Sequence, residues 1–503
     1  GRVHRVPEAG VVGPPGDEYH RHIRYHDLAG PGGTEGDGAD DVVAFDRMAN
    51  AQCWPDVSIS EDGRHLLVHV MVKWTSVDVH LLDTTSGEWT VVVEGQDAQS
   101  ALRVVGDFLV GVTTLDAPNG RVVRAPLAKP AAWTTMVPER PDVVLGAHAS
   151  CGDELLVVAG HVGVDTIERW PGGATVDPTP IDLGIASVVA LDASHGRAFV
   201  ARGTFGAPID LLRFTAGEGL LPWGERPDGS ALPQITVTQV RYASLDGTMI
   251  PMFVAHRADV VPSPDTPLIL TGYGGFAITE SPVWMPNLVA WCAAGGVYCI
   301  AGLRGGYEYG EAWHRAGRRS HKQRVFDDFH AAADWLVAQG FTRRDLLALH
   351  GGSNGGLLMG AAITQRPDLA AAVWCAVPLL DMIRFPQFLI ARLWTDEYGD
   401  PDVADEFAWL QAYSPYHHVH TGRAYPAVLF TTAEGDTRVD PCHARKMAAA
   451  LTWASSCQAE RPILLLQTGR AGHGVGKPAS MRVAEGADVL SFFCWQLAVE
   501  DIA

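Results

Sequence analysis

The chain has 503 residues, of which 47% are hydrophobic and 19% are charged, and this balance is that of an ordinary globular protein with room for two or three domains. Its formal net charge of −20 argues against nucleic acid or an anionic membrane as a partner, because both are bound through basic patches. The 8 cysteines show no zinc-like spacing, and several stand inside apolar runs. We therefore expect buried free thiols, no metal, no cofactor and a cytoplasmic location.

The N-terminal stretch gives no targeting signal. Residues 1–20 are rich in proline and glycine and lack the apolar core of a signal peptide, although the chain begins with Gly1 and an earlier loss of such a peptide stays open. The uncharged stretch 281–303 is the membrane candidate of the sequence. Its prolines and a Gly-Gly break predict a helix, a turn and a strand instead.

Residues 1–234 carry a repeat that is typical of β-strands. Turn-like glycines recur at steps of 47, 43, 46 and 44 residues, at Gly16, Gly63, Gly106, Gly152 and Gly196. Short apolar strands follow all but the first, at residues 66–68, 108–110, 155–158 and 198–201. This period predicts about five four-stranded blades of a β-propeller. A β-sandwich with coincidental spacing stays open as the alternative.

The pattern changes from residue 235 to strands that alternate with helices. Strands are predicted at 237–242, 250–256, 268–270, 297–301, 346–350, 372–376, 427–431 and 463–467. Helices are predicted at 326–339, 441–454 and 487–497, each with apolar residues at helical spacing. This alternation predicts a mostly parallel sheet with helices on both faces.

The most informative motif is G-x-S-x-G at Gly351, Ser353 and Gly355, which lies between an apolar strand and a helix-forming stretch. Glycine on both sides lets the backbone make the strained turn that exposes a serine hydroxyl. The N-terminal amides of the new helix would point at the same place and could hold an oxyanion. An ordinary glycine-rich turn is the alternative, but the flanking strand and helix favour a nucleophile elbow with Ser353 as the nucleophile.

A serine nucleophile needs an imidazole to take its proton and a carboxylate to orient that imidazole. In folds with a nucleophile elbow the chain order is Ser, acid and His. Asp436 follows the strand predicted at 427–431, and His473 follows the strand predicted at 463–467. Taken singly, Asp436 could be a helix N-cap and His473 a solvated loop residue. Their order, strands and flanking glycines favour a triad.

Ordered motifs across residues 235–503 resemble the prolyl oligopeptidase family of serine peptidases. The matching stretches are TGYGGF (271–276), RGGYEYGEAWH (304–314), KQRVFDDF (322–329), GGSNGG (351–356), RLWTDEYG (392–399), YSPYHHV (413–419), GDTRV (435–439) and AGHGVGKP (471–478). The resemblance implies an α/β-hydrolase catalytic domain over 235–503, preceded by a β-propeller over 1–234, and the same triad. The family has a hydrolase segment before a larger propeller, so we expect the propeller to be incomplete at its N-terminus; a natural short form stays open.

The resemblance also implies roles around Ser353. Tyr273 would join the backbone N–H of Asn354 in the oxyanion hole, and Arg438 would bind a substrate backbone carbonyl. The slot for a proline ring would consist of Phe276, Leu379, Trp394, Tyr398 and Val439. Such a slot suits proline, whose ring is apolar and rigid and whose nitrogen carries no hydrogen. A match at residues 117–121 (APNGR) implies that Arg121 reaches the substrate from the propeller.

These residues predict a serine endopeptidase that cleaves short proline-containing peptides on the carboxyl side of proline, as a monomer with no cofactor, no metal, no nucleic acid and no membrane. Another acyl hydrolase on this scaffold stays open: an oligopeptidase with a different preference, an acylaminoacyl peptidase or an esterase. An inactive propeller binding protein is a third possibility. A pocket for basic residues would need buried carboxylates, and the motif offers Trp394 there instead.

Overall fold

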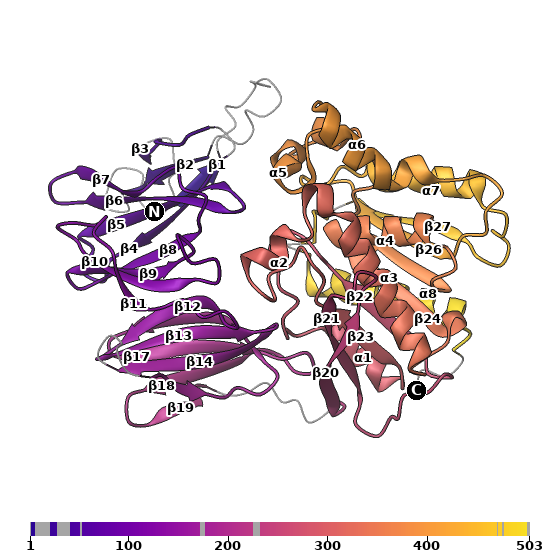
Figure 1. Ribbon diagram of the computed structural model, residues 1–503, viewed down its shortest axis with the longest axis horizontal. Helices are drawn as coiled ribbons and strands as arrows, with labels where there is room; N and C mark the ends of the chain where they lie inside the picture. Colours follow the sequence, from indigo (N-terminus) through magenta and orange to yellow (C-terminus); the bar gives the residue numbers. More distant parts are fainter. Residues whose placement is uncertain are drawn as a thin grey trace.

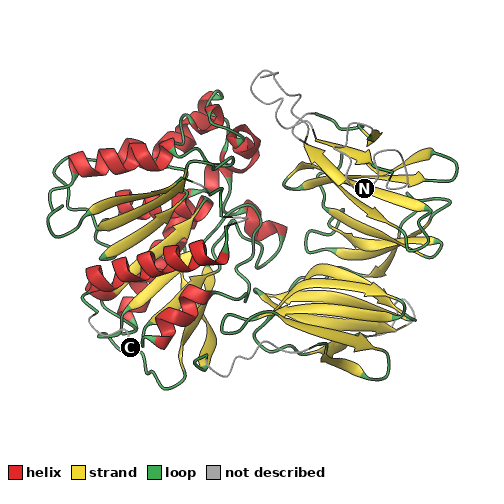
Figure 2. Cartoon of the chain, turned by 180° about the vertical axis from the view of Figure 1, so that it is seen from behind, coloured by secondary structure: helices red, strands yellow, loops and turns green. Residues whose placement is uncertain are grey.

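The computed structural model of the chain describes residues 2–5, 21–27, 41–50, 53–171, 177–224, 232–469, 471–474 and 477–499. Two parts lie side by side, as Figure 1 and Figure 2 show from opposite sides. The N-terminal part consists of strands, and the C-terminal part is a sheet covered by helices.

Five antiparallel sheets make up the N-terminal part. The first sheet has three strands, β1 (Arg2–Arg5), β2 (Arg21–Tyr25) and β3 (Val42–Phe45). Four sheets of four strands follow: β4–β7 (Trp54–Ile59, His65–Lys73, Ser76–Asp83, Glu88–Val93), β8–β11 (Ser100–Val105, Phe108–Thr113, Arg121–Pro126, Thr134–Val137), β12–β15 (Val144–Cys151, Glu154–His161, Val164–Pro171, Thr179–Ile181) and β16–β19 (Ser187–Ser194, Arg197–Gly203, Asp210–Thr215, Gly219–Pro222). In each of them neighbours in the chain are neighbours in the sheet.

The glycine repeat marks one turn of this unit. Gly63, Gly106, Gly152 and Gly196 each join the first and second strands of a four-stranded sheet, and each has a positive φ, between 55° and 73°. L-residues with side chains rarely adopt this backbone, which is why glycine recurs there. Gly16, the first of the predicted series, lies outside the described residues.

Successive sheets pack face to face through small apolar clusters. Leu156 and Val158 of one sheet, for example, share a cluster with Val200 and Phe214 of the next. Three further clusters of this kind join the other neighbouring pairs of sheets. A row of four-stranded meanders is the architecture of propeller blades and differs from a sandwich of two sheets. The propeller prediction is therefore confirmed.

One eight-stranded sheet forms the centre of the C-terminal part, with the order β20-β21-β23-β22-β24-β25-β26-β27. Its strands are β20 (Ile235–Ala243), β21 (Met249–Arg257), β22 (Leu268–Gly272), β23 (Val297–Ala301), β24 (Leu347–Gly352), β25 (Ala372–Ala376), β26 (Ala427–Ala433) and β27 (Ile463–Thr468). The strands from β22 to β27 run parallel to one another, whereas β20 is antiparallel to β21 and β21 is antiparallel to β23. This is the mostly parallel sheet that the sequence predicts.

Helices cover both faces of this sheet (Figure 1). The helices are α1 (Pro286–Ala293), α2 (Glu311–Arg315), α3 (Gln323–Ala338), α4 (Asn354–Gln365), α5 (Thr395–Tyr398), α6 (Ala404–Tyr413), α7 (Cys442–Ala454) and α8 (Ala479–Leu497). Short 3-10 helices are η3 (Arg319–His321), η4 (Arg344–Leu346), η5 (Phe385–Gln387), η6 (Ala391–Trp394) and η7 (Pro415–His418). Helices α3, α4 and α7 share one core with one face of the strands, and α1 and α8 share a second core with the other.

The two parts meet through polar and aromatic contacts. Ser187 donates its hydroxyl to the Pro282 carbonyl at 2.6 Å, and the Gln239 side chain donates to the Val162 carbonyl at 2.7 Å. In the described ranges no helix is long and apolar enough to cross a membrane, and residues 281–303 hold α1 and β23 instead. The cysteines are free thiols; five of them are buried as predicted, whereas Cys442, Cys457 and Cys494 are partly exposed.

Candidate active site

Ser353 lies at the sharp turn between β24 and α4. Its φ of 58° and ψ of −116° are unusual for a residue with a side chain, and such strain is typical of functional positions. A Cβ added at Gly351 would stand 2.2 Å from the Gly355 carbonyl oxygen, and one at Gly356 would stand 2.6 Å from Pro378 Cβ. The turn can therefore form only with glycine at these two positions, and it leaves the serine at the carboxyl end of the sheet.

Asp436 and His473 follow β26 and β27 and are joined to each other. The Asp436 carboxylate is buried, and its Oδ1 accepts the backbone N–H groups of Arg438 at 2.8 Å and Val439 at 2.9 Å. Its other oxygen, Oδ2, lies 2.7 Å from His473 Nδ1. A carboxylate can only accept, so this contact places the imidazole hydrogen on Nδ1 and leaves Nε2 free to act as a base.

Ser353 and His473 line one small cavity of about 90 Å³. The other lining residues are Trp74, Tyr273, Phe276, Ile278, Leu379, Trp394, Tyr398 and Arg438. Except for Trp74, all of them come from the C-terminal part. The structure thus brings most of the predicted site residues around one volume, next to the strained serine.

Two hydrogen-bond donors lie beside Ser353. Tyr273 follows β22, and burial raises the pKa of its hydroxyl to about 12, an effect that a hydrogen bond with Ser353 counteracts. The phenol therefore keeps its proton at neutral pH and can donate. Asn354 is the first residue of α4, where backbone N–H groups have no partner within the helix. A tyrosine hydroxyl and a helix N-terminal amide are suitable donors to an oxyanion.

Aromatic rings form the apolar wall of this cavity. Phe276 meets Tyr398 edge to face, with ring centroids 5.5 Å apart, and Tyr398 meets Phe385 in the same way at 5.6 Å. Trp394 at the end of η6 and Leu379 are both buried in the same core. These side chains leave little freedom for the wall to move, so it presents a fixed flat surface.

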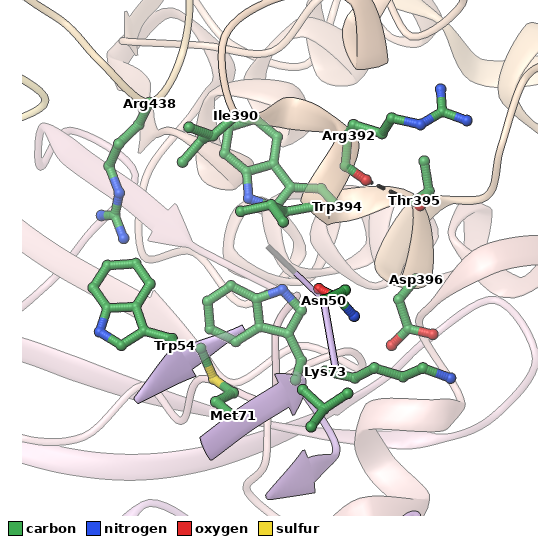
Figure 3. A pocket seen from close by; sticks show the side chains of 13 residues that line it. Asn50, Trp54, Met71, Lys73, Ile390, Arg392, Trp394, Thr395, Asp396 and Arg438 are labelled. Carbon is green, nitrogen blue, oxygen red and sulfur yellow. Dashed lines mark hydrogen bonds between the residues drawn. The ribbon is translucent and has the colours of Figure 1, made fainter. Parts of the chain in front are cut away.

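A second cavity of about 210 Å³ adjoins the first, and Trp74, Trp394 and Arg438 line both. Figure 3 shows that its walls come from opposite sides: Trp54 and Met71 from β4 and β5 face Ile390 and Trp394 of the C-terminal part. Its lining is largely aromatic and aliphatic, with Lys73, Arg392 and Asp396 at its border. The two cavities thus meet at the junction of the two parts, with lining residues from both.

Comparison with known proteins identifies the family of the chain. Residues 283–500 match the model of the prolyl oligopeptidase family, and residues 15–201 match the model of the prolyl oligopeptidase N-terminal beta-propeller domain. A structure from an analysis of two prolyl endopeptidases is 35% identical in sequence, with a TM-score of 0.89 over 98% of this chain and 72% of that one. The chain belongs to the prolyl oligopeptidase family.

Family members with curated descriptions are longer than this chain. The prolyl endopeptidase of Elizabethkingia meningoseptica is 31% identical over 88% of this chain and 64% of its own length. The prolyl endopeptidase of Dictyostelium discoideum is 40% identical over 52% of this chain and 35% of its own length. The chain therefore spans less than two thirds of the length of these prolyl oligopeptidase relatives.

Three residues that the family resemblance implies line neither cavity: Asn354, Val439 and Arg121. Val439 is buried in the core and does not line either cavity; its backbone N–H supports Asp436. The Arg121 guanidinium donates to the Leu115 carbonyl at 3.1 Å and to Thr135 at 3.0 Å within its own blade. In this structure two of the guanidinium nitrogens thus bond within the propeller, and Arg121 lines neither cavity.

Trp74 and Ile278 also line the smaller cavity and are not among the site residues that the sequence predicts. Trp74, in the turn between β5 and β6, meets Phe276 edge to face at 5.1 Å and lines both cavities. Its position in a short strand-turn-strand unit resembles that of many propeller turns. A tryptophan in a turn that folding alone does not require was the available signal, because turns usually favour small or polar residues.

Proposed function

We propose that the chain is a serine peptidase that hydrolyses short peptides on the carboxyl side of proline. The observation that carries the proposal is the shared cavity, which Ser353, His473 and Trp394 line together. Nucleophile, base and a flat apolar wall thus surround one volume. The matching family models and the prolyl endopeptidases among the relatives support the same activity.

In the proposed mechanism Ser353, Asp436 and His473 act as a catalytic triad. His473 Nε2 takes the hydroxyl proton of Ser353 as its oxygen attacks the carbonyl carbon that follows the proline ring. Asp436 keeps the imidazole in the correct tautomer and stabilises its positive charge. The tetrahedral oxyanion is held by the Tyr273 hydroxyl and the Asn354 amide. His473 then protonates the leaving amine, and water attacks the acyl-enzyme by the same route.

The preference for proline follows from the wall of the smaller cavity. Proline presents a rigid apolar ring and no backbone N–H, so its binding depends on ring contact and not on a hydrogen bond. Trp394, Tyr398 and Phe276 offer that contact. Arg438 borders both cavities and carries no ion pair within the described residues, so it is placed to bind a carbonyl of the preceding residue.

A preference for basic residues at the scissile position is the rival hypothesis that the structure addresses. A buried carboxylate does lie behind the wall: Glu397 accepts the backbone N–H of Phe276 at 3.1 Å. Its charge is already matched, because His314 Nε2 lies at 2.8 Å and Lys322 Nζ at 3.7 Å. A substrate cation would have to displace both, so Glu397 supports a neutral ring in the cavity and not a basic side chain.

The activity is tested with chromogenic dipeptides that differ only in Pro, Ala or Arg at the scissile position. We expect the highest kcat/KM for Pro and no turnover by the Ser353→Ala variant. Equal rates for Pro and Ala would instead favour a broader acyl hydrolase, and fastest cleavage after Arg would favour the basic-specific rival. No Ser353-dependent turnover of any peptide or ester would favour an inactive binding protein.

The setting of this activity belongs to the same proposal. Free cysteines throughout the chain support a reducing compartment, and hence the cytoplasm. We propose that the protein acts as a monomer on short peptides, without nucleic acid or a membrane as partner. A cavity with walls from both parts of the molecule supports the restriction to short peptides, because a folded protein could not enter between these walls.

A further inference from the structure

The loop after β22 carries two of the groups that the proposed reaction needs. Tyr273 supplies a hydroxyl next to Ser353, and Phe276 forms part of the apolar wall. The loop is conformationally demanding: Phe276 and its neighbour Ala277 have φ values of 58° and 53°. This backbone conformation is unfavourable for a residue with a side chain unless the surroundings hold it. Something outside the loop must therefore fix this conformation.

Side chains from three other elements hold the loop backbone. Asn354 Nδ2 donates to the Tyr273 carbonyl at 2.6 Å. Lys322 Nζ, just before α3, donates to the Gly274 carbonyl at 2.8 Å. Glu397 of α5 accepts the Phe276 N–H at 3.1 Å. Three backbone groups among four consecutive residues are thus fixed by side chains that are distant in sequence.

Two of these holding residues belong to one buried charge cluster. Lys322, Glu397 and His314 are each at most 1% exposed in their side chains. His314 Nε2 lies 2.8 Å from one carboxylate oxygen of Glu397, and Lys322 Nζ lies 3.7 Å from the other. Burial lowers the pKa of Lys322 to about 8, against the attraction of Glu397. Such clusters are expensive to bury and often stabilise a fold no better than apolar side chains would.

Neither Lys322 nor Glu397 lines the two cavities, so neither would touch a bound peptide. Their hydrogen bonds to the site go to the loop backbone, and Lys322 Nζ also lies 5.3 Å from the ring centroid of Tyr398. We propose that Lys322 and Glu397 are positioning residues whose charge cluster holds the 273–276 loop so that the Tyr273 hydroxyl stays at the oxyanion site. The consequence of this inference for catalysis rests on the proposed function. The holding of the loop by Lys322 and Glu397 does not depend on that function.

The first measurement is amide hydrogen exchange in the segment 273–278. Lys322→Met removes the donor to Gly274, and the double variant Lys322→Met/Glu397→Gln removes it without changing the net charge. We expect exchange in this segment to become at least about tenfold faster in both variants. The control is Arg344→Met, which breaks an ion pair with Asp334 near the other end of α3 and should leave the segment unchanged.

The second measurement is a double-mutant cycle with Tyr273→Phe on the chromogenic proline peptide. Alone, Lys322→Met should lower kcat by roughly 10- to 100-fold with little change in KM, since a small displacement of a catalytic donor has such an effect. In the Tyr273→Phe background most of that loss should disappear, because the group being positioned is already gone. A global loss of stability would multiply the two effects instead.

These results separate the inference from the proposed function. If Ser353-dependent cleavage is absent, the proposed function fails, and hydrogen exchange still decides whether the cluster holds the loop. Unchanged exchange in segment 273–278 in both variants would overturn the inference. Multiplicative effects in the cycle would overturn it as well, even on an active peptidase, because Lys322 would then act on something other than Tyr273. If Lys322→Met does not fold, the charge-balanced double variant takes its place in both measurements.

Discussion

The two parts of the molecule are built on different principles. The C-terminal part has two large cores on the faces of one continuous sheet, and it supplies Ser353, Asp436 and His473. The N-terminal part divides its apolar residues among small clusters between separate sheets, and it supplies Trp54 and Trp74 to the cavity walls. This difference indicates that reacting groups need one rigid frame, whereas a wall that selects substrates can come from a part built of separate small sheets.

The largest effect should come from removing the nucleophile in the rigid frame. Ser353→Ala should lower kcat on the proline peptide on the order of 10⁴-fold or more. Folding should be intact, because the serine side chain contributes little packing at an exposed turn. Thermal unfolding serves as the control. A variant that keeps a tenth of the wild-type rate would exclude Ser353 as the nucleophile.

Asp436→Asn should come next, with a loss on the order of 10⁴-fold in kcat. The amide can keep the backbone contacts with Arg438 and Val439, but as a donor toward His473 it would favour the wrong tautomer. Steady-state rates at several pH values provide the measurement. A normal rate would mean that another group orients the imidazole and that Asp436 is not the carboxylate of the triad.

Tyr273→Phe removes one donor and leaves the ring in place. We expect a loss of roughly 100-fold in kcat, with KM and thermal stability nearly unchanged. The test uses several substrates, since an oxyanion donor acts on the carbonyl that all of them share. Wild-type rates across the series would show that the hydroxyl does not stabilise the transition state.

Trp394→Ala tests a residue that belongs to the rigid C-terminal part but should affect the choice of substrate. Loss of its ring contact should remove about 1–3 kcal/mol of discrimination between Pro and Ala substrates. Arg438→Ala is the counterpart and should weaken all peptides alike. Trp453→Ala is the matched control, because its indole is 84% exposed on α7. Equal losses for Pro and Ala would indicate that Trp394 is only a core residue.

Trp74→Ala should have the smallest effect and is the direct test of the modular wall. Without its edge-to-face contact with Phe276, KM for longer peptides should rise about two- to tenfold while kcat stays the same. The exposed Trp453 again provides the control substitution. A fall in kcat with unchanged KM would show that the N-terminal part contributes to the reaction itself, contrary to the division described above.

Local chemistry explains what the sequence could predict. Strands, the glycine turns and the elbow at Ser353 depend on residues close together in the chain, and the structure has them where the patterns lie. The contact of Trp74 with Phe276 joins positions about two hundred residues apart, and no local pattern fixes it. The substrate contact that the motif at Arg121 implies stays a prediction, and in the structure one guanidinium nitrogen bonds Thr135 of the neighbouring strand.

The placement of Trp74 against Phe276 has a thermodynamic consequence. A peptide that occupies both cavities touches both parts of the molecule at once. Part of its binding free energy therefore stabilises the association of the two parts. At a hundredfold excess over Kd a ligand stabilises the form that binds it by about 2.7 kcal/mol. A bound peptide therefore acts as a removable crosslink between the two parts, and a non-hydrolysable one should make them melt as a single cooperative unit.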